Sequence, residues 1–183
     1  MIVGIDEVGR GCWAGPLVAA AVVLAEPIAG LTDSKKLSKL QRKVLAKEIY
    51  FKAAAVGLGW TDAKTIDAIG LSAANRQAME IALAQITAPY SRIIIDGSYN
   101  FLAEVPGTET LIGADGLVPA VSAASIIAKT ARDAFMVEAA MQYPEYGFDK
   151  HVGYGTRFHS DMLKLYGVCE LHRRSYKPVQ ALL

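Results

Sequence analysis

Cysteine is scarce in this chain of 183 residues, which contains only Cys12 and Cys169. Two cysteines placed this far apart provide neither a disulfide framework nor a Cys-x-x-Cys metal or redox pair. We therefore expect both to be small buried hydrophobic residues. Such sparing use of cysteine is typical of proteins in a reducing cytoplasm.

Long hydrophobic runs are absent as well. The longest apolar stretch covers residues 17–25, between Pro16 and Glu26, whereas a membrane-spanning helix needs about 20 apolar residues. The first residues contain no basic segment followed by an apolar one, so we expect no secretion signal. These absences disfavour a membrane protein and an exported protein.

The chain also lacks a strong net charge, since 19 basic residues face 18 acidic ones for a formal net charge of +1. The distribution of charge is nevertheless uneven. Residues 31–52 hold seven bases and two acids, residues 150–177 hold six bases and two acids, and the rest of the chain is left at −8. Two basic segments beside an acidic remainder fit a polyanion bound next to a cation site, although solvated helix faces would give the same counts.

Apolar residues, by contrast, make up 52% of the chain. This content supports a packed core, and 183 residues suffice for one domain of ordinary size. We find no internal repeat and no linker rich in Gly or Ser. We therefore predict a single domain over residues 1–183, whose part after about residue 143 forms a loop and a helical segment.

Five short segments, most of them rich in Val and Ile and bounded by turn residues, predict β-strands. They are residues 1–5, 17–25, 51–60, 93–95 and about 110–113. The first two resemble a hairpin, and helical patterns separate the later ones. This order predicts an α/β domain with a mixed sheet.

Three helical regions are predicted between and after these strands. Ser38 and Gln41 form a capping-box pattern ahead of a basic helix. The apolar residues expected to share one face of that helix are Leu40, Val44, Leu45 and Ile49.

The second helical region is expected to be capped by Thr61, interrupted at Gly70 and resumed over residues 71–86. Pro119 stands at the first position of a third, long helix that ends near residue 142.

Acidic side chains follow two of the predicted strands directly. Asp6 and Glu7 end the first strand, and Asp96 follows three isoleucines. An unpaired charge at such a place is expensive unless a cation or hydrogen bonds compensate it, and acids at the carboxyl ends of neighbouring strands converge on one sheet edge. The pattern predicts a site of hard oxygen ligands suited to two Mg²⁺ or Mn²⁺ ions and to phosphodiester hydrolysis.

Asp6 and Glu7 cannot both point into that site from a regular strand, because successive side chains face opposite ways. Either the chain bends at Val8-Gly9, or Glu7 contributes partly through its backbone carbonyl.

Beyond these acids, successive blocks of the chain resemble those of bacterial ribonuclease HII. The blocks are residues 6–11 (DEVGRG), 14–21 (AGPLVAAA), 33–38 (DSKKLS), 96–97 (DG), 122–129 (SAASIIAK), 132–133 (RD), 146–148 (YGF), 153–156 (GYGT) and 172–176 (HRRSY). They occur in the family's order and cover nearly the whole chain.

The resemblance implies a ribonuclease H-like α/β fold with a mixed central sheet flanked by helices and a short C-terminal helical segment. It implies a metal-dependent endonuclease that cuts RNA in RNA/DNA hybrids and single ribonucleotides in duplex DNA, leaving 3′-hydroxyl and 5′-phosphate ends. Such an enzyme would act in DNA replication and ribonucleotide excision repair. A ribonuclease HIII-like hybrid nuclease and a catalytically silent hybrid-binding module are the alternatives, with a two-carboxylate glycoside hydrolase a distant third.

The residues that the resemblance assigns fall into two groups. The catalytic and metal-binding acids would be Asp6, Glu7, Asp96 and Asp115, with Asp133 competing for the fourth place unless it pairs with Lys129 one helical turn away. The substrate-binding residues would be Gly9, Arg10 and Gly11, whose backbone reads the ribose 2′-OH, Tyr154 on the sugar, and Ser34, Lys35, Lys36, Arg173 and Arg174 near phosphates. For Ser34 and Ser125, a helix cap and back-bonding within a helix are the more ordinary roles.

Two departures from the family pattern concern loop shape. Cys12-Trp13 stands where a pair such as Pro-Leu is expected, and Gly155 stands where proline is common. The sequence carries no long helical extension like that of archaeal and eukaryotic relatives, so we expect a monomer of the bacterial type. A replication clamp could be a partner, but no short docking motif is evident in residues 178–183.

Overall fold

The computed structural model describes residues 1–182 of the chain; Leu183, the last residue of the segment inspected for a clamp motif, lies outside the described residues. Its centre is a five-stranded sheet in the order β3-β2-β1-β4-β5. The strands are β1 (Ile2–Val8), β2 (Leu17–Leu24), β3 (Ala53–Thr61), β4 (Arg92–Asp96) and β5 (Thr108–Leu111). The first three pair antiparallel, while β4 pairs parallel with both β1 and β5, so the predicted mixed sheet is confirmed.

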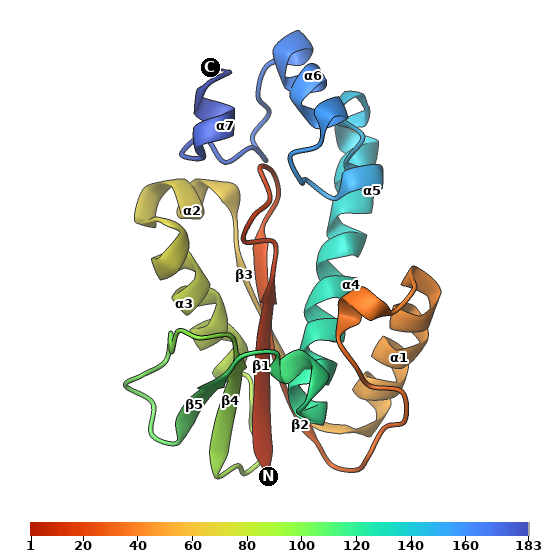
Figure 1. The fold of residues 1–183 in the computed structure, drawn as a ribbon, viewed down its shortest axis with the longest axis vertical. Helices are drawn as coiled ribbons and strands as arrows, with labels where there is room; N and C mark the ends of the chain where they lie inside the picture. The colour runs from red at the N-terminus through yellow and green to blue at the C-terminus, as the bar shows by residue number, and fades with distance from the viewer. Residues whose placement is uncertain (183) are drawn as a thin grey trace.

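Helices cover both faces of this sheet (Figure 1). The α-helices are α1 (Lys39–Lys52), α2 (Ala63–Ile69), α3 (Leu71–Leu83), α4 (Pro119–Gln142), α5 (Phe148–His151), α6 (Arg157–Tyr166) and α7 (Lys177–Gln180), and the short 3-10 turns are η1 (Ser34–Lys36), η2 (Ala114–Gly116) and η3 (Pro144–Tyr146). No helix of the described residues is long and apolar enough to cross a membrane.

The strand β2 is buried on both sides, which explains its continuous apolar run. Its alternate residues join two separate cores: Ala19 and Ala21 pack with α3, while Ala20 and Val22 pack with α1 and α4. Because side chains alternate along a strand, a sequence of uninterrupted small and branched residues is what a strand between two helical layers requires.

Glycine lets α4 approach the sheet closely. A Cβ at Gly4 of β1 would lie 2.1 Å from the backbone carbon of Ala120. A larger residue there would push α4 away from β1, and with it Asp115, which lies in the turn just before α4.

Element boundaries differ from the predictions at several points. The strand β1 runs on through Val8, so Asp6 and Glu7 lie inside it. The helix α1 continues to Lys52, which delays the start of β3. The cap of α2 is Asp62, whose side chain accepts the amide of Thr65, and not Thr61.

The predicted apolar face of α1 is only partly correct. Leu45 and Ile49 are buried as expected, but Leu40 and Val44 are 73% and 58% exposed. The stripe that reaches the core is narrower than the periodicity suggested, because α1 packs on α4 and on the edge of the sheet rather than across a broad face.

Residues after Tyr143 form short helices that gather at one end of the molecule, beside the loop between β1 and β2 (Figure 1). Their apolar side chains, with those of α4, build a separate core that includes Met136, Phe148 and Leu163. Loop residues take part as well, since Ala14 is fully buried there.

Three histidines lie in and beside this core with fixed hydrogen-bond roles. The carbonyl of Tyr154 can only accept, so His159 carries its proton on Nδ1, 2.9 Å away. The amide of Cys169 donates to Nδ1 of His172, which leaves the proton of His172 on Nε2, pointing at Nε2 of His159 at 3.0 Å. Both rings are therefore neutral, and desolvation lowers the pKa of each to about 4, with His151 shifted in the same direction.

We expect His159 and His172 to destabilise the folded state as the pH falls from about 6.5 to about 4, against an opposite contribution from Asp6, whose raised pKa stabilises the folded state on acidification. In this window the unfolded chain binds protons on His159 and His172 that the folded chain excludes, which lowers the free energy of unfolding by up to about 1.4 kcal/mol per pH unit for each histidine. Urea unfolding between pH 7 and pH 4.5 measures the slope. A His172→Asn variant should show a shallower slope, and an unchanged slope would contradict the neutral assignment.

Candidate metal centre and nucleic-acid interface

Three aspartates meet at the centre of the sheet. Carboxylate oxygens of Asp6, Asp96 and Asp115 lie within 4.8 Å of one another. Asp6 comes from β1, Asp96 ends β4, and Asp115 lies in η2 just before α4. The amide of Asp115 also faces Oδ1 of Asp96 at 3.4 Å. The structure thus brings together three of the four predicted acids.

Asp133 does not belong to this group. Its carboxylate pairs with Lys129 at 2.8 Å and with Arg42 at 3.7 Å. Asp133 therefore forms an ordinary ion pair with Lys129 one helical turn away, and Asp115 is the acid that lies with Asp6 and Asp96.

Glu7 is on the opposite face of β1 from Asp6. The strand stays regular through Val8, so the bend considered for residues 8–9 does not turn the two side chains together. Oε1 of Glu7 accepts Arg10 at 3.2 Å. Burial raises the pKa of Glu7, and the neighbouring guanidinium of Arg10 opposes this shift.

Burial and mutual repulsion shift the acids of the site toward the protonated form. Burial, then the charge of Glu7, raises the pKa of Asp6 to about 8, with Asp96 adding to the shift. Burial and the neighbouring charge of Asp96 likewise raise the pKa of Asp115. Three carboxylates this close are unstable as anions without a compensating charge.

A divalent cation fits this donor set. Carboxylate oxygens are the ligands that Mg²⁺ and Mn²⁺ prefer, and a bound cation would reverse the unfavourable electrostatics that raise the pKa of Asp6 and Asp115. Ser125 supports the cluster, since its hydroxyl lowers the pKa of Asp6 and lies 2.9 Å from that of Ser34.

Lys35 approaches the acids from the side. Its side chain is 78% exposed, and its amine lies 3.6 Å from Oδ2 of Asp115 and 3.9 Å from Oδ1 of Asp33. Although desolvation opposes it, the carboxylates of Asp33 and Asp115 raise the pKa of Lys35. Lys36 is exposed. Ser34, by contrast, is buried on Ser125 and is not the cap of its turn, because Asp33 accepts the amide of Lys35.

Gly9 and Gly11 differ in the backbone conformation and in the space around the position of a Cβ. Gly9 has φ +93°, and a Cβ there would lie 2.3 Å from Nε of Arg132. Gly11 has open space where a Cβ would be. The first glycine is needed by the fold, whereas the second leaves the backbone of the loop accessible to a ligand.

The two neighbouring arginines predicted to contact phosphates differ sharply. Arg173 is fully buried, and its guanidinium donates to the carbonyls of Gly15 and Arg10 at 2.9 to 3.1 Å. It is therefore not available to a phosphate, which corrects the prediction: its contacts fix the loop of residues 10–15. Arg174 is exposed, and its amide is bonded to Asp67.

Tyr154 is 43% exposed in the loop after α5, and the two departures from the family pattern meet beside it. A Cβ at Gly155 would lie 2.1 Å from the indole of Trp13. The glycine makes room for the tryptophan, so the departures compensate each other. The loops are also joined by the amide of Trp13, which donates to Gly153 at 2.8 Å.

Arg132 and Asn75 are structurally important residues that the sequence did not reveal. Arg132 is fully buried in α4 and donates to carbonyls of Ala14, Pro16 and Val152. Asn75 is also fully buried, and its amide has no hydrogen-bond partner within the described residues. Both residues stand among other polar residues of their helices, so the residue type does not show that the side chain is buried or what it contacts.

Comparisons with known proteins agree with this geometry. The sequence model of the family described as Ribonuclease HII matches residues 3–179. The Ribonuclease HII of Halorhodospira halophila is 49% identical over 185 residues, a match covering 100% of this chain and 94% of that protein. The chain belongs to the ribonuclease HII family. It is thus an endoribonuclease of a metal-dependent family that acts on RNA/DNA hybrids.

Solved ribonucleases H share the fold. The ribonuclease H2 of Pyrococcus horikoshii superposes with a TM-score of 0.84 at 24% identity, covering 99% of this chain and 96% of that one. Bst-RNase HIII, solved in complex with Mn²⁺, superposes with a TM-score of 0.73 at 21% identity, covering 99% and 68%. The ribonuclease H-like architecture expected from the sequence is confirmed.

Proposed function

We propose that this ribonuclease HII cuts both continuous RNA/DNA hybrids and duplex DNA containing a single ribonucleotide, leaving 3′-hydroxyl and 5′-phosphate ends. The observation that carries the proposal is the set of three aspartates whose carboxylate oxygens lie within 4.8 Å of one another. The enzyme would act as a monomer in the cytoplasm, where it would take part in DNA replication and ribonucleotide excision repair. Residues 1–183 would act as one catalytic unit.

Asp6, Asp96 and Asp115 would hold Mg²⁺ or Mn²⁺, with Glu7 approaching from the other face of β1. The proximity of Glu7 to the aspartates is supported by the pKa of Glu7. Burial raises this pKa most, Arg10 lowers it, and the charge of Asp96 raises it further. The chemistry that metal ions would supply there is the activation of a water molecule and the stabilisation of the leaving oxygen in phosphodiester hydrolysis.

The chain's own residues would supply recognition. The loop backbone of residues 9–11, held by the buried guanidinium of Arg173, would meet the 2′-OH that distinguishes RNA from DNA. Tyr154 would pack on the neighbouring sugar, supported by its exposure beside that loop. Lys35, Lys36 and Arg174 would contact phosphates, which set affinity and register without reading sequence.

The decisive experiment is cleavage of a DNA duplex that carries one ribonucleotide. We expect a single cut at the ribonucleotide with Mg²⁺ or Mn²⁺ and none in EDTA, because the acids alone cannot activate water. An all-DNA duplex is the negative control and a continuous hybrid the positive one. Cleavage of the hybrid with no cut at the single ribonucleotide would favour the ribonuclease HIII-like alternative, and metal-stimulated cleavage of neither would reject the proposal.

A further inference from the structure

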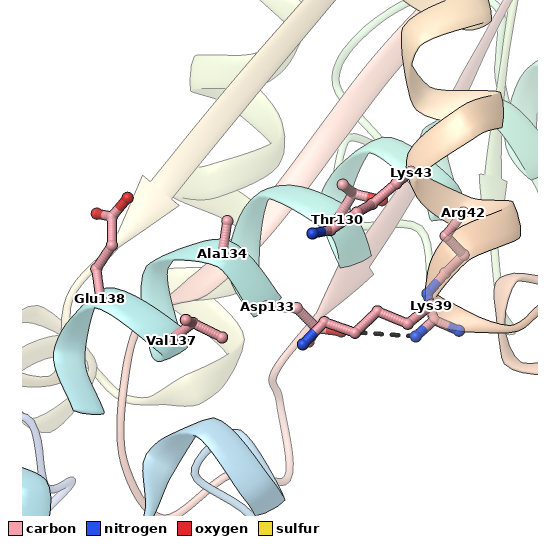
Figure 2. A pocket seen from close by; sticks show the side chains of 8 residues that line it. All are labelled: Lys39, Arg42, Lys43, Thr130, Asp133, Ala134, Val137 and Glu138. Carbon is pink, nitrogen blue, oxygen red and sulfur yellow. Dashed lines mark ion pairs between the residues drawn. The ribbon is translucent and has the colours of Figure 1, made fainter. Parts of the chain in front are cut away.

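A cavity of about 240 Å³ lies between the first turns of α1 and the middle of α4, and the three aspartates of the metal site do not line it. Figure 2 shows the side chains of Lys39 and Lys43 extending from α1 toward α4, which carries Thr130, Ala134 and Val137. Its lining residues are Lys39, Arg42, Lys43, Thr130, Asp133, Ala134, Val137 and Glu138. We call this the α1–α4 pocket.

The lining of the α1–α4 pocket contains three basic and two acidic side chains, and the positive charge is concentrated on the side of α1. Asp133 is neutralised by Lys129 and Arg42, and Glu138 lies at the opposite end of the α1–α4 pocket from the lysines (Figure 2). Among residues 1–182, neither Lys39 nor Lys43 forms an ion pair. The amines are therefore available to an external anion.

The positive charge of Lys39 also lies at the N-terminal end of α1, where the helix dipole is unfavourable for a cation. Lys39 is the first residue of α1, and the first turn contains no acidic residue. Because the N-terminus of a helix carries the positive end of its dipole, lysines there oppose the dipole and anions are favoured. An anion in the α1–α4 pocket would offset both the helix dipole and the lysine charges.

An unsatisfied hydroxyl lines the same cavity. Oγ1 of Thr130 is buried and has no hydrogen-bond partner within the described residues. A buried polar atom without a partner is destabilising unless something fills the role. A phosphate oxygen is an acceptor that the lysine amines would bind directly, and the Thr130 hydroxyl, which has almost no accessible surface, would reach it after a rotation of its side chain.

The α1–α4 pocket is structurally tied to the cleavage site. Arg42 in its wall donates to the carbonyls of Ser34 at 3.0 Å and Leu37 at 2.6 Å, and so fixes the loop that carries Lys35 over Asp115. Ser34 in turn contacts Ser125 beside the acids. A nucleic-acid strand passing over Lys35 would continue toward the pocket.

We propose that the α1–α4 pocket binds a backbone phosphate of the substrate duplex, at a distance from the cut, through Lys39, Lys43 and the hydroxyl of Thr130. This inference rests on the proposed function, since the phosphate belongs to the bound nucleic acid. It adds a second point of attachment that aligns the duplex and leaves the chemical step unchanged.

The test is the salt dependence of binding, measured in EDTA with a 20-bp RNA/DNA hybrid so that no cleavage occurs. In the Lys39→Gln/Lys43→Gln double variant, the slope of log K against log salt should become shallower by about 1 to 2. Affinity near 0.1 M salt should fall about tenfold, with kcat at saturating substrate unchanged in Mg²⁺. Thr130→Val should weaken binding about fivefold with no change of slope.

The matched control is Lys47→Gln/Lys64→Gln, which removes the same charge from exposed lysines on α1 and α2 outside the cavity. Equal changes of slope in both pairs, or no change in the first, would overturn the inference. Because binding is measured without metal, a protein that binds with the expected slopes but cuts no substrate would reject the proposed function and support the phosphate site.

Discussion

Replacing Asp6 with asparagine should lower the rate of hybrid cleavage about 1000-fold while leaving binding of the hybrid in EDTA nearly unchanged. Metal-assisted stabilisation of a phosphoryl transition state amounts to several kcal/mol, and each 1.4 kcal/mol is about a factor of ten in rate. Asp6 is one of three aspartates whose oxygens lie within 4.8 Å of one another, so its loss leaves the ion with too few anionic ligands. Single-turnover cleavage in Mg²⁺ measures the effect.

The same Asp6→Asn variant should be more stable than the parent in the absence of metal. Burial is the first cause that raises the pKa of Asp6 to about 8. Between about pH 4 and pH 8 the unfolded chain therefore ionises Asp6 while the folded state keeps it protonated, and the free energy of unfolding falls as the pH rises through this window. One pKa unit corresponds to about 1.4 kcal/mol, and the neutral amide should therefore gain at least about 2 kcal/mol at pH 7. Thermal unfolding in EDTA checks this gain. A variant that is inactive and also less stable would indicate misfolding, and full activity would remove Asp6 from the site.

The sheet was predictable because its signals are local. Three isoleucines before Asp96 and the apolar run of β2 identify buried strands, and the capping box at Ser38 marks the start of α1. The boundary of α1 with β3 was wrong by two residues, since Phe51 and Lys52 fit a strand pattern but continue the helix. Local propensity does not fix the boundary between a helix and the following strand when both make strong tertiary contacts.

The acids were found for a different reason. Chemistry and the sheet topology require charges at neighbouring strand ends to converge, so Asp6 and Asp96 could be placed together before any coordinates. Asp115 was predicted only through the resemblance to the ribonuclease HII family, because it lies in an irregular turn whose distance from β4 no periodicity fixes. Its rival Asp133 could be rejected only when its partners Lys129 and Arg42 were visible.

Arg173 could not be read correctly from the sequence at all. Two adjacent arginines in a basic segment predict two phosphate contacts, yet burial separates them: Arg173 is 0% exposed, while Arg174 is exposed. The buried guanidinium finds its acceptors in the carbonyls of Arg10 and Gly15, more than 150 residues earlier in the chain. Only tertiary structure reveals contacts of this range.

Replacing Arg173 with methionine should therefore destabilise the fold and impair the loop that it holds. The variant leaves the carbonyl of Gly15 without its donors, and a buried polar group left unpaired costs about 1–3 kcal/mol, with more lost from charge-assisted bonds. We expect a loss of about 3 kcal/mol, equivalent to a fall in Tm of roughly 6–12 °C for a chain of this size. Because residues 10–15 then move, kcat/KM on a single-ribonucleotide duplex should fall about 100-fold.

The matched control is the neighbouring Arg174→Met variant. Its side chain is exposed, so stability should change by less than about 0.5 kcal/mol. If Arg174 contacts a phosphate as proposed, the slope of log K against log salt for hybrid binding should become shallower by about 1. The two variants thus have opposite signatures, one in stability and the other in the salt slope. If Arg173→Met kept its Tm and showed only the shallower slope, the buried arginine would be a phosphate ligand, and the account of how residues 10–15 are positioned would be wrong.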